Sequence, residues 1–342
     1  MLTRISTIPG ALSEAATLLR AGNLVAFPTE TVYGLGADAR SDAAVQKIYD
    51  AKGRPSGNPI IVHIANTAAA RAAAQFWPES TSKLAETFWP GPLTLIVPRG
   101  AGISATVSAG RDTVALRVPS HPVAQALLRE FNGPIAAPSA NRSGFTSPTS
   151  AQHVLAELSG RIPLILDGGT CEVGLESTVL DLTTTPPKIL RPGAITAEML
   201  HAIIGPVETL HAVVREEDYA ASPGQHSRHY APRTPAFRIS RADLARCGPN
   251  PARYAAMLAS AGSKLILITH DPAITLPPPH ETMLLPADPA AYAQKLYASL
   301  RAADELQMAA ILILAPEHTH GLWSAIHDRL RRATRPYAPA TL

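Results

Sequence analysis

The segment Lys52–Pro59, with the sequence KGRPSGNP, and the apolar segment Ile60–Ile64 that follows it, IIVHI, organise the rest of the chain. The first segment contains two cations, two glycines and two prolines, so little helical or ladder hydrogen bonding is open to it. Its backbone N–H groups are therefore free for an external acceptor, and Lys52 and Arg54 place positive charge beside them. A polyanion such as a triphosphate would suit this loop, and a plain basic surface loop is the alternative interpretation.

Length and composition indicate an ordinary globular protein of two domains. The chain has 342 residues, 46% of them hydrophobic and 17% charged. Its net charge of +3 is too small to indicate nucleic-acid binding by itself. Cys171 and Cys247 have neither metal-ligand spacing nor a disulfide pattern, and they fit a reducing cytoplasm. We expect no signal peptide and no membrane span, because no apolar stretch approaches the roughly 20 residues that a span requires.

Helical and strand-like segments alternate along the first two-thirds of the chain. This pattern predicts an α/β or α+β layer structure on one mixed, strongly twisted sheet, whose strand order is not readable from the sequence. Strands are expected at 24–27, 60–64, 93–97, 114–118, 134–137, 164–166, within 174–181 and at 188–193. Helices are expected at 11–21, 41–51, within 66–87, from 120, and at 150–159 and 196–204.

The alternation of helical and strand-like segments stops after residue 205 and resumes at residue 236. Residues 206–235 have few apolar runs and are interpreted as an ordered linker between domains 1–205 and 236–342. The second domain is predicted to be a smaller α/β unit. Its expected strands are 264–268 and 310–314, and its expected helices are 289–306 and 322–333.

Polar side chains follow two of the predicted strands. Thr29 and Thr31 come after 24–27, and Ser139 and Asn141 come after 134–137. Ligands usually bind at this end of strands, and hydroxyl groups suit a small ligand with an amine, a hydroxyl and a carboxylate. Turn or cap chemistry is the alternative for each residue taken singly.

Arg117 lies inside an apolar strand and therefore needs a partner. That partner is either an internal carboxylate, Glu30 or Glu176, or the carboxylate of a ligand held by two hydrogen bonds. His63 has a similar setting, and it is either a satisfied core residue or a ligand contact.

Arg191, together with Lys52 and Arg54, would suit the phosphate tail of a nucleotide. The chain has no Walker-type glycine run, no Rossmann glycine fingerprint and no G-x-S-x-G, so a nucleotide site would be of another type. His226 and His229 stand three residues apart without another ligand near in sequence. We interpret them as linker contacts, and we expect no protein-bound metal.

Eight blocks of the sequence stand out together, in the order 27–36, 52–55, 58–63, 89–94, 115–119, 138–141, 175–179 and 190–193. In this order they resemble the YrdC-type threonylcarbamoyl-AMP synthases. Segments 222–224, 229–232 and 325–330 are similar to the linker and the last helix of the long, two-domain form. The resemblance covers nearly the whole chain and implies a twisted mixed-sheet catalytic domain with a smaller Rossmann-like domain after it.

The resemblance implies a nucleotidyltransferase that converts L-threonine, bicarbonate and ATP into L-threonylcarbamoyladenylate and pyrophosphate. Mg²⁺ is expected to arrive with ATP, held by phosphate oxygens rather than by a protein cage. The product would serve threonylcarbamoyladenosine formation in tRNA, after hand-over to the tRNA threonylcarbamoyl transferase complex. The carbamate is already an anion, so no strong general base is required, which accounts for the missing catalytic triad.

The same resemblance assigns residues to the two substrates. Threonine would be surrounded by Thr31, His63, Arg117, Ala137 and Ser177. ATP would be contacted by Lys52, Arg54, Asn58, Thr113, Ser139, Asn141, Ser147, Arg191 and Tyr230, with Lys52 and Arg54 in catalytic roles. Residues 225–228 depart from the family's linker, which is expected to close over the pocket as a lid.

Two other functions fit parts of the pattern. The catalytic domain of this family has a concave basic face, so a non-catalytic RNA-binding module is the main alternative, although the mild charge argues against strong RNA binding. Carbamoyl transfer, as in hydrogenase maturation proteins, is a second alternative. Those proteins carry acylphosphatase and zinc-finger segments that this chain lacks.

Overall fold

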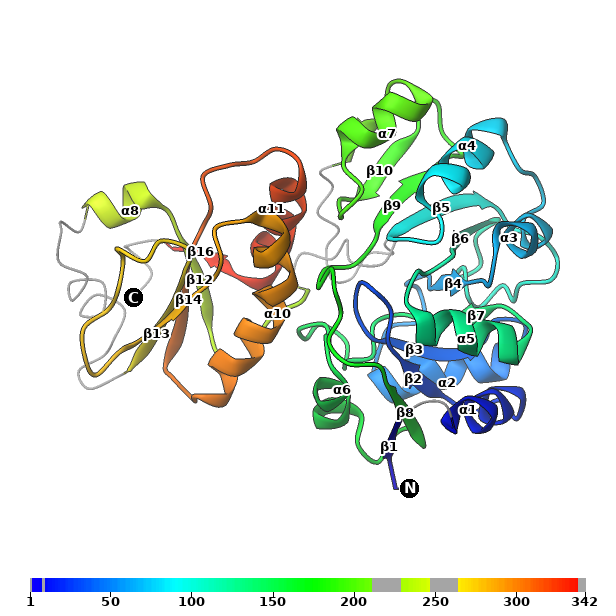
Figure 1. The fold of residues 1–342 in the computed structure, drawn as a ribbon, viewed down its shortest axis with the longest axis horizontal. Coiled ribbons are helices and arrows are strands. Elements are labelled where there is room, and N and C mark those ends of the chain that lie inside the picture. The colour runs from blue at the N-terminus through cyan, green and yellow to red at the C-terminus, as the bar shows by residue number, and fades with distance from the viewer. Residues whose placement is uncertain (1, 8–9, 211–228, 247–263, 338–342) are drawn as a thin grey trace. The chain divides into compact units, whose positions relative to one another are not determined.

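The computed structural model describes residues 2–7, 10–210, 229–246 and 264–337 (Figure 1). The chain divides into two compact units. The first consists of Met1–Ser143 and Ser147–Ser227, and the second of Gly144–Thr146 and Arg228–Leu342. Three residues from the middle of a first-unit loop therefore fold with the second unit. Most of the predicted linker, 211–228, lies outside the described residues, as does Cys247.

One mixed sheet forms the first unit, as predicted. Its strand order is β1-β8-β2-β3-β7-β4-β6-β5-β9-β10-β11. Both parallel and antiparallel pairs occur along it, which confirms the mixed sheet that the sequence predicted. The strands are β1 (Arg4–Thr7), β2 (Val25–Phe27), β3 (Gly34–Asp38), β4 (Ile61–His63), β5 (Leu93–Pro98), β6 (Thr113–Arg117), β7 (Ile135–Ala136), β8 (Leu164–Asp167), β9 (Thr178–Asp181), β10 (Lys188–Arg191) and β11 (Glu208–Thr209).

Seven helices pack against this sheet in the described part of the first unit. Polar side chains cap most of them: Ser41 accepts from the Ala44 amide, and Ser150 accepts from the His153 amide. The helices are α1 (Ala11–Arg20), α2 (Asp42–Lys52), α3 (Thr67–Ala73), α4 (Glu79–Phe88), α5 (Pro122–Phe131), α6 (Ala151–Leu158) and α7 (Ala197–Ile204). The predicted helices are confirmed, with Pro122 at the start of α5.

Buried apolar side chains lie on both faces of the sheet. In β2, Ala26 joins one cluster while Val25 and Phe27 join the other. Strand β8 divides in the same way, with Ile165 on one side and Leu164 on the other. Because successive side chains of a strand point to opposite faces, both faces are covered, and these strands read as continuous apolar runs.

Strand β3 was not predicted, because its sequence GLGAD resembles a loop. It pairs antiparallel with β2 and with β7 in the middle of the sheet. A Cβ atom at Gly36 would lie 2.9 Å from Phe27 Cε1 and 3.0 Å from Ile135 Cγ2. The glycine is therefore required by close packing inside a strand. The edge strand β1 was also missed.

The second unit is a parallel five-stranded sheet in the order β14-β13-β15-β12-β16, which confirms the predicted smaller α/β unit. Its strands are β12 (Ala236–Ile239), β13 (Leu265–Thr269), β14 (Glu281–Leu284), β15 (Ala310–Leu314) and β16 (Arg335–Pro336). Its helices include α8 (Arg241–Arg246), α10 (Pro289–Glu305) and α11 (Leu322–Ala333). None of the described helices has the length and apolar character needed to cross a bilayer.

Candidate active site

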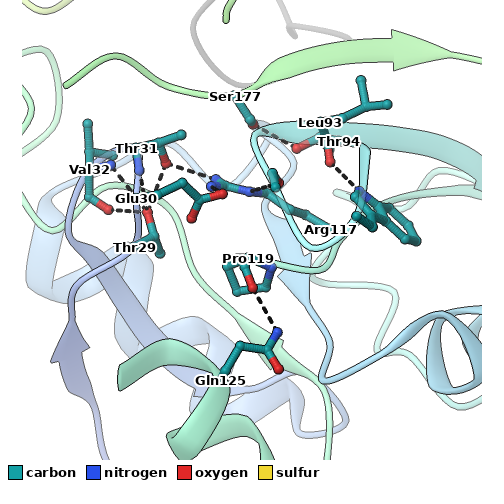
Figure 2. Close-up of polar contacts among 12 residues, drawn as sticks. Thr29, Glu30, Thr31, Val32, Leu93, Thr94, Arg117, Pro119, Gln125 and Ser177 are labelled. Carbon is teal, nitrogen blue, oxygen red and sulfur yellow. Dashed lines mark hydrogen bonds and ion pairs between the residues drawn. The ribbon is translucent and has the colours of Figure 1, made fainter. Parts of the chain in front are cut away.

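A turn after β2 places the hydroxyl-rich segment Thr29–Val32 beside the centre of the sheet (Figure 2). The Thr29 hydroxyl accepts from the amides of Thr31 and Val32, both at 3.2 Å, and donates to the Val32 carbonyl at 2.6 Å. The Thr29 hydroxyl therefore stabilises the turn, which confirms the alternative interpretation of this residue as a turn former. The Thr31 hydroxyl lies 2.8 Å from that of Thr29 and is buried with it.

Arg117, at the end of β6, is the centre of this site and is only 3% exposed. Its Nη1 donates to the Thr31 hydroxyl at 2.9 Å, and its Nε donates to the Gly91 carbonyl at 3.2 Å. Its Nη2 lies 2.8 Å from Oε1 of Glu30. Of the two carboxylates proposed as its internal partner, Glu30 is the one that pairs with Arg117, because Glu176 accepts a hydrogen bond from Ser147 instead.

The Glu30 carboxylate stays ionised despite its burial. Burial alone would raise its pKa. The charge and proximity of Arg117, with smaller effects from the backbone amides of Glu30 and Ser120, outweigh burial and hold the pKa below its ordinary value. Glu30 and Arg117 therefore form a buried pair of opposite charges at neutral pH.

His63 lies directly beside Arg117, because β4 and β6 pair in parallel with these two residues in register. Burial, and then the positive charge of Arg117, lower the pKa of His63 well below its ordinary value, so the imidazole is neutral at pH 7. The ring meets Phe27 edge to face at a centroid distance of 5.9 Å. Its Nδ1 is buried without a hydrogen-bond partner among the described residues, so His63 is not a fully satisfied core histidine.

Hydroxyl groups from two adjacent strands meet on the same part of the sheet. The hydroxyls of Thr94 in β5 and Ser177, which precedes β9, lie 2.7 Å apart. Arg191 donates through Nη2 to the Ser177 hydroxyl at 3.1 Å and through Nε to its carbonyl at 3.0 Å. Arg191, which the sequence predicts at the phosphate site, is therefore hydrogen-bonded to Ser177, which it predicts at the threonine site. Sequence reasoning missed Thr94, although it ends the 89–94 block.

Lys52, the last residue of α2, is only 2% exposed. Its ammonium group donates to the Ser139 carbonyl at 2.6 Å and also to the Asn141 carbonyl. Burial, and then the charge of Arg54, lower the pKa of Lys52 well below its ordinary value. The side chain therefore organises the 138–143 loop, and the phosphate contact that the sequence suggested for it stays a prediction.

The 137–147 segment brings further predicted residues toward the sheet. The Ala137 amide donates to the Ile61 carbonyl at 2.9 Å, which ties this segment to β4. The Ser147 hydroxyl donates to Glu176 Oε1 at 2.5 Å, and both residues are buried. The Asn141 side-chain amide donates to the Arg142 carbonyl at 2.9 Å.

The remaining predicted nucleotide contacts are more dispersed. Arg54 is half-buried and donates to the Pro59 carbonyl at 3.1 Å, while Asn58 is buried with its carbonyl 3.0 Å from the Tyr49 hydroxyl. Thr113 begins β6, and is therefore about 13 Å along the strand from Arg117. Tyr230 belongs to the second unit, where it is buried against Tyr297, with ring centroids 5.6 Å apart.

No group of three or more acidic, histidine or cysteine side chains within the described ranges could hold a metal ion. Glu30 and Glu176 are engaged by Arg117 and Ser147. The polar groups of the site instead offer guanidinium cations, hydroxyls and a neutral imidazole. Such a set suits an organic ligand that carries a carboxylate or phosphate.

Comparison with known proteins gives concordant matches to both units. The Sua5/YciO/YrdC family model, described as "Telomere recombination", matches residues 17–193. A second model, described as "Threonylcarbamoyl-AMP synthase, C-terminal domain", matches residues 195–334.

Individual relatives agree with the family models. A threonylcarbamoyl-AMP synthase of Bacillus subtilis is 49% identical over 250 residues, which is 73% of this chain and 70% of the relative. One from Pyrococcus abyssi is 49% identical over 219 residues, or 64% of each chain. The crystal structure of P. abyssi Sua5 complexed with L-threonine superposes with a TM-score of 0.88 at 37% identity, over 99% of this chain and 100% of that one.

Proposed function

This chain belongs to the Sua5/YciO/YrdC family of threonylcarbamoyl-AMP synthases, and we propose that it joins L-threonine, bicarbonate and ATP into L-threonylcarbamoyladenylate. Water leaves as the amino group and bicarbonate form the carbamate, and pyrophosphate leaves as the carbamate is adenylated, which makes the enzyme a nucleotidyltransferase. The observation that supports the proposal most directly is the buried Arg117 group. A cation, hydroxyls and a neutral imidazole lie together there in one buried cluster.

The threonine half of the proposal places the amino acid against Thr31, His63, Arg117, Ala137 and Ser177. Arg117 supplies charge for the carboxylate, and the unpartnered Nδ1 of His63 supplies a polar contact. A homologous structure with L-threonine bound supports threonine as the amino acid.

The nucleotide half places the phosphates near Arg54 and Arg191, with Ser139 and Asn141 held in position by Lys52. Asn58, Thr113, Ser147 and Tyr230 complete the proposed ATP contacts. Arg191 contacts Ser177, so it joins the two halves of the site. The threonine carbamate would therefore form next to the phosphate that it attacks.

The chemistry requires positioning and positive charge more than proton removal. The carbamate oxygen attacks the α-phosphate of ATP, the bond from that phosphate to pyrophosphate breaks, and guanidinium groups stabilise the charge that develops. We propose that Mg²⁺ arrives with ATP, held by the phosphate oxygens rather than by a protein cage, where it would neutralise their charge.

The decisive test is threonine-dependent release of pyrophosphate from ATP in the presence of bicarbonate and without RNA. We expect release that requires all three substrates. An unchanged rate when threonine or bicarbonate is omitted would contradict the proposal.

We further propose that the product is handed to a tRNA threonylcarbamoyl transferase complex in the cytoplasm. Weak RNA binding by the chain is a secondary prediction, and the RNA-binding module without catalysis is not favoured by the family match. Transfer of labelled threonine carbamate to tRNA by a reconstituted transferase complex tests the hand-over.

A further inference from the structure

The Glu30 carboxylate is buried and has few hydrogen-bond partners besides its ion pair with Arg117. It is only 3% exposed, and one oxygen, Oε1, lies 2.8 Å from Arg117 Nη2. Neither carboxylate oxygen accepts a hydrogen bond of normal geometry from the described residues, although the backbone amides of Glu30 and Ser120 lie close. Apart from its ion pair with Arg117, Glu30 is therefore a buried anion without well-aligned hydrogen-bond donors.

A buried ionised carboxylate normally accepts several hydrogen bonds, because removing it from water without donors is costly. Among the neighbouring side chains, Arg117 offers Glu30 one contact through Nη2, at 2.8 Å, and directs Nη1 to Thr31 and Nε to Gly91. The imidazole of His63 is uncharged. A molecule bound in the site can supply the further donors that the carboxylate accepts.

The ammonium group of an amino-acid substrate can supply the hydrogen-bond donors that Glu30 needs. An α-amino acid at neutral pH carries one carboxylate and one ammonium group, which are separated by a single carbon atom. Glu30 and Arg117 present the complementary pair of charges side by side. A zwitterion can lie against this pair with each charge facing its opposite, and the buried site stays neutral overall.

We propose that Glu30 binds the amino group of the amino-acid substrate and makes the site selective for α-amino acids. This inference rests on the proposed function. Glu176, the other buried carboxylate of the site, already accepts from Ser147 at 2.5 Å, so Glu30 is the better placed anion for an ammonium group.

Glu30 holds the nitrogen in place and does not remove its proton. The Arg117 guanidinium keeps the pKa of Glu30 below its ordinary value, which makes the carboxylate a weak base. Its contribution is to fix the position and orientation of the nitrogen that becomes carbamoylated.

The test compares two ligands on two proteins. The ligands are L-threonine and (R)-3-hydroxybutanoate, which keeps the carboxylate, hydroxyl and methyl groups of threonine but lacks the amino group. The proteins are the wild type and Glu30→Gln, which keeps the side-chain size and removes the charge. Affinities are measured on the full chain by calorimetry, and by ligand-observed NMR where binding is weak.

We expect Glu30→Gln to weaken L-threonine binding about tenfold or more, because a charged hydrogen bond is lost. The affinity for (R)-3-hydroxybutanoate should change by less than about twofold. Asp38→Asn is the matched control, because Asp38 is also an acid paired with an arginine, Arg40, and it lies outside the site. This control should bind both ligands as the wild type does.

Equal weakening of both ligands would overturn the proposal, because it would mean that Glu30 only supports Arg117. Unchanged threonine binding in Glu30→Gln would overturn it as well. Should Glu30→Gln fail to fold, the wild type alone still decides: it must bind L-threonine at least about tenfold more tightly than (R)-3-hydroxybutanoate. A wild-type chain that binds no threonine at all would instead contradict the proposed function.

Discussion

At the scale of single residues, the site depends on charges that are buried yet paired. Arg117 makes contacts to Thr31, Glu30 and Gly91, and Lys52 is bound to two backbone carbonyls. Arg54 differs from both, because it is half-buried in the loop that follows α2. The first two cations are thus part of the architecture, while Arg54 is the cation best placed to meet a nucleotide.

Arg54→Ala should abolish most adenylate formation, by about 100-fold, because a cation that faces developing phosphate charge is lost. The free energy of unfolding should change by less than about 1 kcal/mol, since the residue is only half-buried. Pyrophosphate release and thermal melting measure the two effects. Arg40→Ala, which breaks an exposed pair with Asp38, is the control, and wild-type pyrophosphate release from Arg54→Ala would contradict the assignment.

His63 should make stability depend on pH. Its pKa is depressed in the folded protein, so the unfolded chain takes up a proton below about pH 6.5 while the folded chain does not. Stability from this group is therefore present above that pH and is lost as pH falls. Between pH 7.5 and 5.5 the wild type should lose roughly 1.4 kcal/mol more than His63→Gln does.

Urea unfolding of both proteins at the two pH values measures this difference, and the other histidines cancel because both proteins contain them. A constant gap between wild type and variant would show that His63 titrates normally in the folded protein.

At the scale of elements, the loops of the site are placed by short strands that pack very closely. Strand β3 passes between β2 and β7, and its Gly36 leaves no room for a side chain. The turn after β10 is equally tight, because a Cβ atom at Gly193 would lie 2.4 Å from the Thr178 amide nitrogen. These glycines let the strands approach closely enough for residues from different loops to meet.

Gly36→Ala should destabilise the protein by roughly 1–3 kcal/mol, because the added methyl group would overlap Phe27 and Ile135. Gly102→Ala is the matched control, since nothing lies within 4 Å of a Cβ atom there. Denaturant unfolding curves give both values. Equal stability of the two variants would show that β3 can shift without cost.

At the scale of the whole molecule, the two units share the loop that precedes Ser147. Within the second unit, the Ala231 amide donates to the Gly144 carbonyl at 3.1 Å, and the Thr146 hydroxyl donates to the Tyr230 carbonyl at 3.1 Å. Arg301 also donates to the Thr146 carbonyl. The second unit thus holds three residues of a loop whose flanks carry proposed nucleotide contacts.

A fragment of residues 1–210 should fold, because the first unit has its own sheet and its own core clusters. It should bind L-threonine within about threefold of the full chain, since every proposed threonine contact lies in this unit. Adenylate formation should be weak, because Tyr230 and the partners of Gly144–Thr146 are removed. Calorimetry measures threonine binding by the fragment, and pyrophosphate release measures its adenylate formation. Full activity in the fragment would exclude a role for the removed residues.

Local pattern was enough to locate most elements. Six predicted first-unit strands, from 24–27 to 164–166, agree with the structure to within one residue at each end. Strand β3 was not predicted because its glycines resemble a loop in the sequence. Only the structure shows that side chains of neighbouring strands pack directly against them. The predicted linker falls mostly on residues 211–228, outside the described part of the chain, so its role as a lid stays a prediction.

The sequence by itself determined the class of the fold, the family and the residue types of the site, because periodicity and ordered motifs are local properties of the chain. Only the tertiary structure decided the partners. It paired Arg117 with Glu30 and not Glu176, turned Lys52 toward two backbone carbonyls, and set His63 beside Arg117. These pairings depend on strand order and register, which bring together residues up to 89 positions apart, and no local pattern encodes such distances.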